Sequence, residues 1–482
     1  MLELSPTELL QELKPIFYPE SIAIVGVSTS RPNAASGWVS GLVHAGFLGS
    51  IYPVNPRGGE MLGLKIYPNL TAIPGHVDYA IISIPRQIVP RILEECAAKK
   101  VKFAHFFTAG YSELGDTTSR SLEIEMIQKA RQGGFHIIGP NGAGSYCPES
   151  KIPYAPTGLM GESGTVSFLT QSGGIGNTFI GSGIARGIKF SKGISFGNGV
   201  DLDGTDLLRY LGADPKTSII GAYFEGAGNG RQLLNAMREV SKAKPIVMLK
   251  GGRTEVGSTV VKSHTGSLAV SSAIWSTALK QAGAIEVRTI EELVDTLLIF
   301  QQLGRWHGRN IAIASGFAGG GGGIAVAAGD ICSEAGLTVP QLSSQTLEKL
   351  TKILGLVGSI LHNPVDVSQA DSKPATLEEA FEAILSDPVI DMLIIQEDIG
   401  ILLVQSTKED VDTINSSLIN LKNKYNKPIV IVMPPSINEP ERLQTEHQLA
   451  QGSIPVFPSM ERAARAISRL SQYSGPDASY RG

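Results

Sequence analysis

"SIAIVGVSTSRPNAASGWVSGLVHAGFLGSIYPVN", residues 21–55, is the stretch that decides the fold. An apolar run ends at Gly26 and is followed by a polar loop, a helical pattern and a second apolar run. This order predicts a strand, a helix and a second strand. The runs lack the two-residue alternation of a half-exposed strand, so we expect both strands to be buried in a parallel sheet.

The same alternation of strands and helices continues along the chain in three series. It predicts an α/β protein with three doubly wound domains, at residues 1–147, 160–303 and 309–474. The proline-rich segment 147–162 is expected to be a linker between the first two domains. A long helix is expected from about Ser272.

The composition excludes several classes of function. The chain has 482 residues and a formal net charge of −4, without clustered Lys and Arg among aromatic residues, so nucleic acid is a poor candidate partner. Cys96, Cys147 and Cys332 lie far apart and form neither a metal-type pair nor a disulfide framework, which fits a reducing cytoplasm. The most apolar window, residues 311–328, is too short and glycine-rich to span a membrane. Residues 1–17 lack the pattern of a signal peptide.

The loop after the first strand has the form of an anion site. A glycine turn at the start of a helix presents backbone N–H groups and the positive end of the helix dipole to a phosphate. However, Ser28 replaces the second glycine of the dinucleotide fingerprint, and the second strand ends in Asn55-Pro56-Arg57 without a ribose-binding acid. The loop therefore disfavours NAD and leaves another adenine nucleotide or a turn that binds nothing.

Two more glycine-rich turns open helices, at residues 170–174 (TQSGG) and 315–323 (SGFAGGGGG). Neither has the lysine of a P-loop, so a nucleoside triphosphate is not indicated, whereas a single phosphoryl group would fit. Glycine clusters at such turns are equally often packing devices.

His264 lies in the segment KSHTGS, residues 262–267. A second ligand at metal spacing is missing, so zinc is not indicated, and the chain has no Gly-x-Ser-x-Gly nucleophile elbow. A neutral imidazole can itself accept a phosphoryl group while a carboxylate holds its other nitrogen, and Glu225 at the end of a strand is the best candidate carboxylate. The alternative is a loop histidine with structural hydrogen bonds only.

Taken together, the motifs resemble a known family. "PVNPR", "FFTAGYSELG", "GPNG", "FLTQSGGIG", "GNGVDLDGTDLLRYL", "GRTEVG", "SHTGSLA" and "NPVDV" follow one another as in the α subunits of ADP-forming acyl-CoA synthetases (acetate–CoA ligase, ADP-forming), of the succinyl-CoA synthetase superfamily. The resemblance covers nearly the whole chain. It implies a Rossmann-like CoA-binding domain followed by two flavodoxin-like, succinyl-CoA synthetase-like domains.

The resemblance also implies roles for individual residues. His264, on a swinging loop, would carry the phosphoryl group, and Glu225 would orient it. The residues expected at coenzyme A are Gly26, Ser28, Gly37, Pro53, Asn55, Arg57, Ile84, Pro85, Thr108, Gly110, Glu113 and Asn141, the last near the acyl group. Those expected at phosphate are Thr170, Gln171, Ser172, Gly173, Gly174, Gly320, Gly321 and Gly322. No metal ligand is expected on this chain.

The implied reaction is acyl-CoA + ADP + phosphate ⇌ carboxylic acid + CoA + ATP. ADP and ATP, with Mg²⁺, would bind to an ATP-grasp β subunit, because no such module is visible in this sequence, and the assembly would be an α2β2 heterotetramer in the cytoplasm. Two other classes stay open: a CoA-binding sensor or scaffold without turnover, and, less compatible with Ser28, an NAD-linked dehydrogenase. The sequence does not identify the acid.

Overall fold

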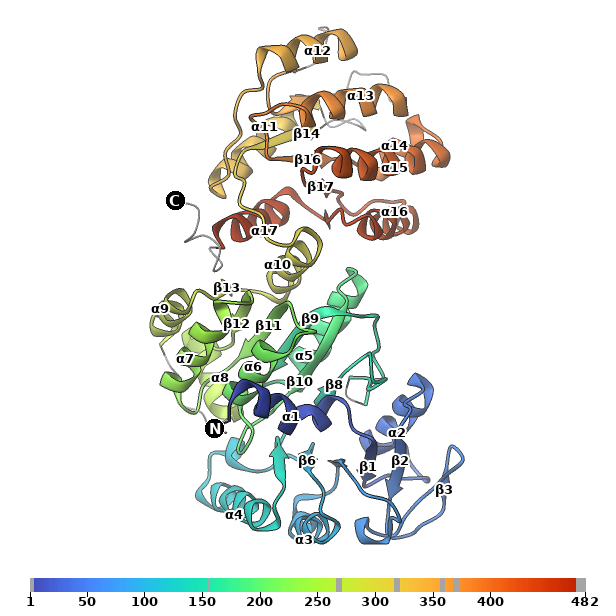
Figure 1. The fold of residues 1–482 in the computed structure, drawn as a ribbon, viewed down its shortest axis with the longest axis vertical. Coiled ribbons are helices and arrows are strands. Elements are labelled where there is room, and N and C mark those ends of the chain that lie inside the picture. Colours follow the sequence, from blue (N-terminus) through green and yellow to red (C-terminus); the bar gives the residue numbers. More distant parts are fainter. Residues whose placement is uncertain are drawn as a thin grey trace. The chain divides into compact units, whose positions relative to one another are not determined.

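The protein is described by a computed structural model over residues 4–154, 156–265, 271–315, 321–355, 360–366 and 373–473, without the side chains of residues 262–265. The described residues divide into two compact units, one within residues 4–294 and the other within residues 295–473. The first unit contains two large sheets and a two-stranded hairpin, and the second unit contains one large sheet (Figure 1).

The first sheet is wholly parallel and has the order β2-β1-β5-β6-β7. Its apolar strands are almost completely buried, as expected for a sheet covered on both faces. The strands are β1 (Ser21–Val25), β2 (Ser50–Val54), β5 (Tyr79–Ile82), β6 (Phe103–Phe106) and β7 (His136–Ile138), with a small hairpin of β3 (Glu60–Met61) and β4 (Leu64–Lys65). The helices are α2 (Ala34–Ala45), α3 (Val89–Lys99) and α4 (Thr117–Gly133), with short 3-10 turns η1 (Leu70–Ala72), η2 (Arg86–Ile88) and η3 (Ser112–Leu114).

The second sheet has the order β13-β12-β11-β9-β10-β8, and only its edge strand β8 is antiparallel. The strands are β8 (Gly144–Tyr146), β9 (Ser163–Thr170), β10 (Phe190–Ser195), β11 (Ile219–Phe224), β12 (Ile246–Lys250) and β13 (Ile285–Val287). The helices are α5 (Gly173–Ala185), α6 (Gly204–Ala213), α7 (Gly230–Ser241), α8 (Glu255–Thr265), α9 (Ser272–Ala282) and α10 (Ile290–Leu303).

The third sheet, in the second unit, is parallel with the order β15-β14-β16-β17-β18. The strands are β14 (Ile311–Ser315), β15 (Val365–Asp366), β16 (Met392–Gln396), β17 (Ile429–Val432) and β18 (Val456–Phe457). The helices are α11 (Gly321–Glu334), α12 (Ser344–Leu354), α13 (Pro374–Leu385), α14 (Ile399–Gln405), α15 (Lys408–Tyr425), α16 (Glu439–Gln451) and α17 (Met460–Gln472).

The three large sheets share one strand order. Counted along each series, the parallel strands run 2-1-3-4-5, the flavodoxin-like doubly wound order. The expected α/β class with parallel sheets is confirmed, and the first sheet has this order too rather than the 3-2-1-4-5-6 order of a dinucleotide-binding fold. In such sheets ligands bind beyond the carboxyl ends of the first and third strands of the series, where the direction of winding reverses. These switch points are β1/β5, β9/β11 and β14/β16.

The proline-rich segment 147–162 is more than a linker. It follows β8, which pairs with β10, and the bridges Cys147–Ile152 and Tyr154–Leu159 fold it back on itself. Tyr154 is fully buried. Proline content signals an irregular backbone, but it does not show whether that backbone packs, and here it packs into the first unit.

The N-terminal helix, α1 (Pro6–Phe17), packs against α6 of the second sheet. The rings of Phe17 and Tyr210 stack with centroids 5.2 Å apart. A capping box between Ser5 and Glu8 begins the helix. Both ends of the range 1–147 therefore attach to the second sheet.

Two expectations for the region around His264 are wrong. The helix that begins at Ser272 has only 11 residues, and β13 and α10 follow it. Residues 255–265 form helix α8, so the backbone of His264 is helical in this structure rather than part of a loop. Over the described residues, we find no helix that combines the length and apolarity needed to cross a membrane.

Candidate functional site

A cavity of about 430 Å³ lies in the first unit, at the carboxyl ends of β9 and β11. It brings together six residues singled out from the sequence, from three separate loops: Asn141, Gln171, Ser172, Gly173, Gly174 and Glu225. Phe107, Gly142, Ala143, Pro156, Thr157, Asn177, Gly197 and Asn198 complete the lining. The volume is within the range of small-molecule sites.

Gln171 joins the two sides of the switch point. Its side-chain oxygen accepts the backbone N–H of Glu225 at 2.5 Å and that of Gly226 at 3.0 Å. The backbone N–H of Gln171 donates to the carbonyl of Tyr223 at 3.2 Å. The loop after β9 is therefore fixed against the loop after β11.

The carboxylate of Glu225 is held by its surroundings. Glu225 is only 6% exposed, and the hydroxyl of Tyr223 donates to its Oε1 at 3.1 Å. The ammonium of Lys250, at the end of β12, donates to the Glu225 carbonyl at 2.7 Å. Burial lowers the pKa of Lys250, and the charge of Glu225 opposes this only in part. Lys250 does not line the cavity, and its bond to the Glu225 carbonyl fixes the backbone that carries the carboxylate.

The turn before α5 presents its helix N-terminus to the cavity. Ser172 is the N-cap and accepts the N–H of Ile175. Gly173 and Gly174 form the first turn and line the cavity, where free backbone donors and the helix dipole favour an anion. Thr170 is fully buried below this turn, and its hydroxyl bonds to the backbone of Ser172. Thr170 thus shapes the turn and does not line the cavity.

The opposite wall comes from the loop after β7. Asn141 has a left-handed backbone, with φ of 60°. The neighbouring Gly142 leaves no space for a side chain, because a Cβ would lie 2.7 Å from the Ser195 carbonyl oxygen. This wall is therefore packed directly on the end of β10.

Comparisons with known proteins agree with this geometry. The CoA binding domain family matches residues 20–147, and the succinyl-CoA ligase like flavodoxin domain family matches residues 163–300. The chain is 33% identical over 471 residues to the acetate–CoA ligase (ADP-forming) I subunit alpha of Pyrococcus furiosus, covering 96% of this chain and 98% of that one. This chain belongs to the ADP-forming acetate–CoA ligase family.

Solved structures give the same relationship. The fold of this ADP-forming ligase chain is similar to that of the dinucleotide forming acetyl-coenzyme A synthetase 1 of Ca. Korarchaeum cryptofilum, solved in complex with phosphate and ADP. The TM-score is 0.84 and the identity 29%, covering 96% of this chain and 97% of that one. By contrast, the chain spans only 63% of the ADP-forming acetate–CoA ligases of Archaeoglobus fulgidus (form I) and Methanocaldococcus jannaschii. Those relatives therefore carry additional sequence.

The residues expected at CoA in this ligase chain first gather around β1. Gly26 directly follows β1 with φ of 102°, and a Cβ there would lie 2.2 Å from the Ser83 carbonyl oxygen, so the turn requires glycine. The N–H of Ser28 donates to the Ser36 hydroxyl at 3.0 Å, which folds the loop onto α2. Gly37, in the first turn of α2, lines a second cavity of about 520 Å³. Pro156 and Thr157 line both cavities, so the two are adjacent.

Three further residues expected at CoA lie in β2 or just after it. Pro53 lies inside the strand and is paired with Ile24. Asn55 donates to the Val27 carbonyl at 2.7 Å and ties this loop to the loop after β1. Arg57 is exposed.

The loops after β5 and β6 carry the other predicted residues, Ile84, Pro85, Thr108, Gly110 and Glu113. The hydroxyl of Thr108 donates to the Ile84 carbonyl at 2.8 Å and joins the two loops. Glu113 is 7% exposed, and its carboxylate accepts the Gly110 N–H at 2.5 Å and the Asn198 side chain at 2.7 Å. In this structure Glu113 therefore connects the first sheet to the second.

Some predicted residues are not brought together. His264 lies on α8, which packs against η3, but its side chain is outside the described residues. Gly320 is likewise outside them, and Gly321 and Gly322 begin α11 in the second unit. A phosphate site shared by both glycine turns remains a prediction.

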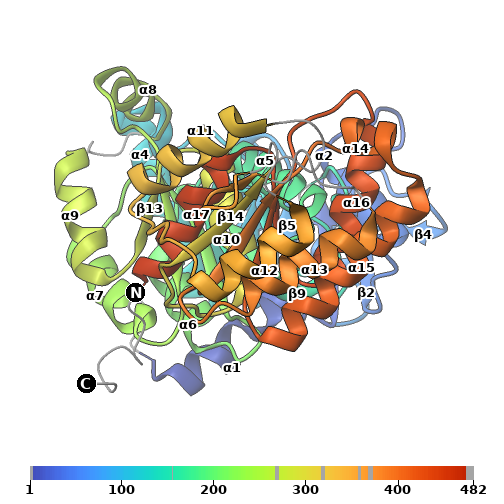
Figure 2. The same ribbon diagram turned by 90° about the horizontal axis from the view of Figure 1, so that it is seen from above.

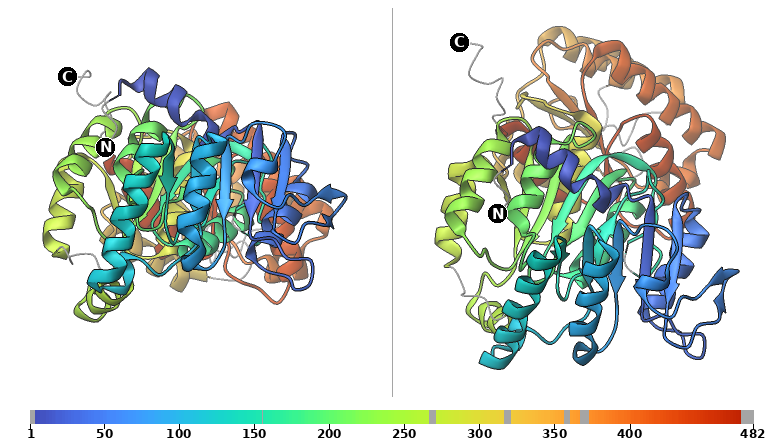
Figure 3. Two further views of the ribbon diagram at one scale, coloured as in Figure 1. Left: turned by 90° about the horizontal axis from the view of Figure 1, so that it is seen from below. Right: turned by 60° about the horizontal axis from the view of Figure 1, so that its bottom comes forward.

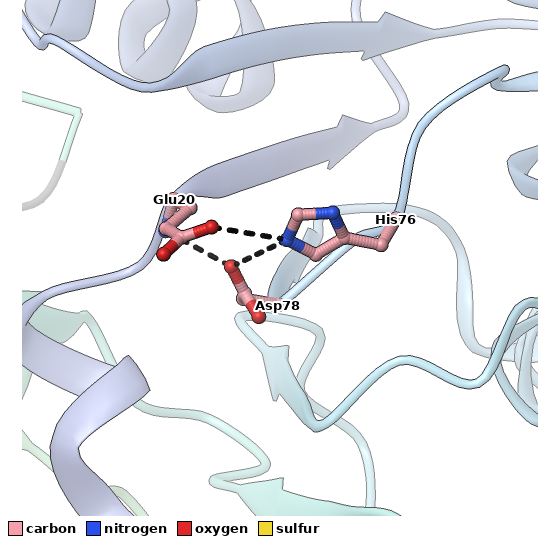
Figure 4. A group of neighbouring side chains, drawn as sticks. All are labelled: Glu20, His76 and Asp78. Atoms are coloured by element: carbon pink, nitrogen blue, oxygen red, sulfur yellow. Dashed lines mark hydrogen bonds and ion pairs between the residues drawn. The ribbon is translucent and has the colours of Figure 1, made fainter.

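The described residues include one group that resembles a metal site, formed by Glu20, His76 and Asp78 (Figure 4). His76 Nε2 lies 3.3 Å from Asp78 Oδ2 and 3.7 Å from Glu20 Oε2. Burial works to raise the pKa of Asp78, but bonds from Lys102 and from the Glu20 N–H outweigh it and lower the pKa. These partners already occupy both oxygens of Asp78, at 3.0 and 2.9 Å. The group thus fastens the amino ends of β1 and β5, opposite the switch point.

Sequence reasoning missed Lys250, Asn198 and Gly197. Each stands at the end of a predicted strand, in "VMLKGG" and "SFGNG", which was the available signal. Polar residues and glycines at strand ends are also common in loops that bind nothing, so position alone did not distinguish them.

Proposed function

We propose that this chain is the α subunit of an ADP-forming acyl-CoA ligase that works with an ATP-grasp β subunit in an α2β2 heterotetramer in the cytoplasm. In one direction, phosphate attacks the thioester carbonyl, CoA leaves as its thiol, and an acyl phosphate forms. The imidazole of His264 takes the phosphoryl group and releases the carboxylate. Phosphohistidine then passes the group to ADP on the β subunit, where Mg²⁺ would bind. Splitting the transfer in this way is nucleophilic catalysis.

The cavity at the β9/β11 switch point carries this proposal. One wall offers an anion the N-terminus of α5, a second carries the buried carboxylate of Glu225, and a third presents Asn141. The loops expected to hold CoA lie in the same unit. One of their residues, Gly37, lines the second cavity, and that cavity shares Pro156 and Thr157 with this one. Such a site suits phosphate and an acyl group, with preorganised donors for the developing charge. CoA, phosphate, ADP and a small carboxylic acid are the substrates we propose.

The test combines the chain with its β subunit and ATP labelled on the γ-phosphate. We expect acid-labile label on His264 and acyl-CoA formation when CoA and a carboxylate are added. His264→Asn should abolish both, and Glu225→Gln should slow the labelling. His447→Asn, an exposed histidine on α16, is the matched control and should behave as wild type. Turnover by the His264 variant would refute the assigned role.

The same experiment separates the alternative of a CoA sensor or scaffold. A sensor would bind CoA but would not acquire label on histidine under any of these conditions. The packing around Gln171 and Glu225 described above favours the enzyme, because it maintains a polar, buried site that a mere scaffold does not need.

A further inference from the structure

A cavity of about 290 Å³ lies between α3 and α4, which run side by side along the first sheet (Figure 3). Its walls are mostly apolar, from Val89, Pro90, Leu93, Leu122 and Met126. None of the residues assigned above to CoA, phosphate or the acyl group lines it. An apolar cavity with a few convergent polar groups is the usual form of a small-molecule site.

Arg86 supplies the charge at this cavity. Its guanidinium donates to the Gly110 carbonyl and, at 3.1 Å, to the Ser119 hydroxyl, both of them uncharged. Within the described part of the chain no carboxylate pairs directly with Arg86. Asp116 lies beyond Ser119, whose hydroxyl donates to it, and the charge of Arg86 contributes only a minor part to lowering the pKa of Asp116. A half-buried guanidinium without a carboxylate partner favours an anionic ligand that it can bind through two N–H groups.

Tyr111 supplies a second polar group. It is 2% exposed and lines the cavity, and its hydroxyl has no hydrogen-bond partner among the described residues. Burial raises the pKa of Tyr111 to about 12, with a smaller opposing effect of Arg86, so the hydroxyl keeps its proton and can donate. A buried polar group left unpaired costs about 1–3 kcal/mol, which a ligand oxygen would recover.

We propose that this cavity binds a small monocarboxylic acid with an apolar body, its carboxylate on Arg86 and Tyr111 and its body between α3 and α4. The volume of about 290 Å³ lies at the lower end of the range of small-molecule sites, which favours a small apolar body. Glu125 is the acidic residue of the lining and is exposed at the rim, where it disfavours a second carboxylate. The proposed site is separate from the cavity at Glu225, since the two linings have no residue in common.

The site is connected to the helix that carries His264. Tyr111 directly precedes η3, and α8 packs against η3. In the view of Figure 2, α8 overlaps α4, the helix that follows η3 along the chain. A ligand that fixes Tyr111 therefore stabilises the surface on which α8 rests. Occupancy should slow amide hydrogen exchange in residues 255–261.

The binding test uses the full chain and phenylacetate, measured by calorimetry, with the neutral phenylacetamide as the comparison ligand. We expect phenylacetate to bind and the amide to bind at least about tenfold more weakly, since a charge-assisted pair is lost. Arg86→Gln should weaken phenylacetate about tenfold or more, and Tyr111→Phe about fivefold. Arg91→Gln, on the exposed side of α3, should leave binding unchanged.

Three results would overturn the proposal: no binding of phenylacetate, equal affinities in wild type, Arg86→Gln and Tyr111→Phe, or competitive displacement of phenylacetate by CoA. The last would make the cavity part of the CoA site. Arg86→Lys keeps a charge and serves as the folding check, and its thermal unfolding midpoint should equal that of Arg91→Gln. These readouts do not need the β subunit, so they are independent of the proposed reaction.

Discussion

The side-chain oxygen of Gln171 lies 2.5 Å from the backbone nitrogen of Glu225 and 3.0 Å from that of Gly226. The side-chain amide of Gln171, which follows β9, thus accepts two backbone N–H groups of the loop after β11. Because both loops line the same cavity, the position of the Glu225 carboxylate depends on this neutral side chain.

Gln171→Met tests this dependence. The variant keeps the length of the side chain but leaves two buried N–H groups without their acceptor, at about 1–3 kcal/mol each. We expect kcat to fall about tenfold to a hundredfold as Glu225 loses its place, with a smaller change in the KM for CoA. Gln128→Met, at an exposed position of α4, is the control for the added thioether. A full-rate Gln171→Met enzyme would show that the contact does not position the carboxylate.

Substitutions at Gly197 and Gly174 distinguish an effect on packing from an effect on ligand binding. Gly197 has φ of 58°, and a Cβ there would lie 2.2 Å from the Pro140 carbonyl oxygen, so Gly197→Ala must displace the loop that carries Asn141. At Gly174 the nearest atom to an added methyl group, Ser172 Oγ, is 4.0 Å away. We expect Gly197→Ala to lower the free energy of unfolding by roughly 1–3 kcal/mol, which lowers the thermal unfolding midpoint by several degrees. Gly174→Ala should keep the midpoint and raise the KM for phosphate; equal midpoints for both variants would contradict the packing argument.

The buried imidazole of His105 predicts that the unfolding free energy of the first unit decreases at acidic pH. Its Nε2 lies 2.8 Å from the Gly142 carbonyl oxygen, and burial lowers its pKa from 6.5 to about 4. Between these two pH values the unfolded chain binds the proton and the folded chain does not, so the unfolding free energy falls as pH falls, by up to about 3 kcal/mol. Hydrogen exchange in β6, measured from pH 7 to pH 4, should show this slope in wild type.

His105→Gln is the variant for this measurement, because its amide can still donate to Gly142 but does not titrate. The slope over pH 4–6.5 should become shallower in this variant. His44→Gln, an exposed histidine on α2, should leave the slope as in wild type. Identical slopes in all three proteins would mean that His105 is not the titrating group.

The sequence allowed the three series and their glycine turns to be predicted, because buried strands such as Ser21–Val25 are short apolar runs and the turn at Gly26 requires glycine. It did not allow the packing of the 147–162 segment to be predicted. The burial of Tyr154 depends on contacts with Gly176 and Gly173, which are distant in sequence. A local pattern carries no information on such contacts.

The candidate site shows the same division. Gln171, Ser172 and Glu225 were identified because each follows a predicted strand, and parallel strands end at one edge. The helical backbone at His264 was not predicted, since the Ser, Thr and Gly residues around it favour turns by propensity. In the structure residues 255–265 form α8 instead, packed against η3, a tertiary contact that outweighs this propensity.

Glu397, which directly follows β16 in the second unit, predicts the opposite pH dependence to that of His105. It is 4% exposed, its Oε1 has no hydrogen-bond partner among the described residues, and burial raises its pKa from 4.5 to about 7. Between these values the folded state binds the extra proton, so the unfolding free energy of this unit falls as pH rises, by up to about 3 kcal/mol.

Glu397→Gln removes the titration, and we expect slower hydrogen exchange in β16 at pH 8 than in wild type and little difference at pH 4.5. Glu409→Gln, on the exposed surface of α15, controls for the change in net charge. If the variant exchanged faster than wild type at pH 8, the ionised carboxylate would be stabilising and the burial argument would be wrong.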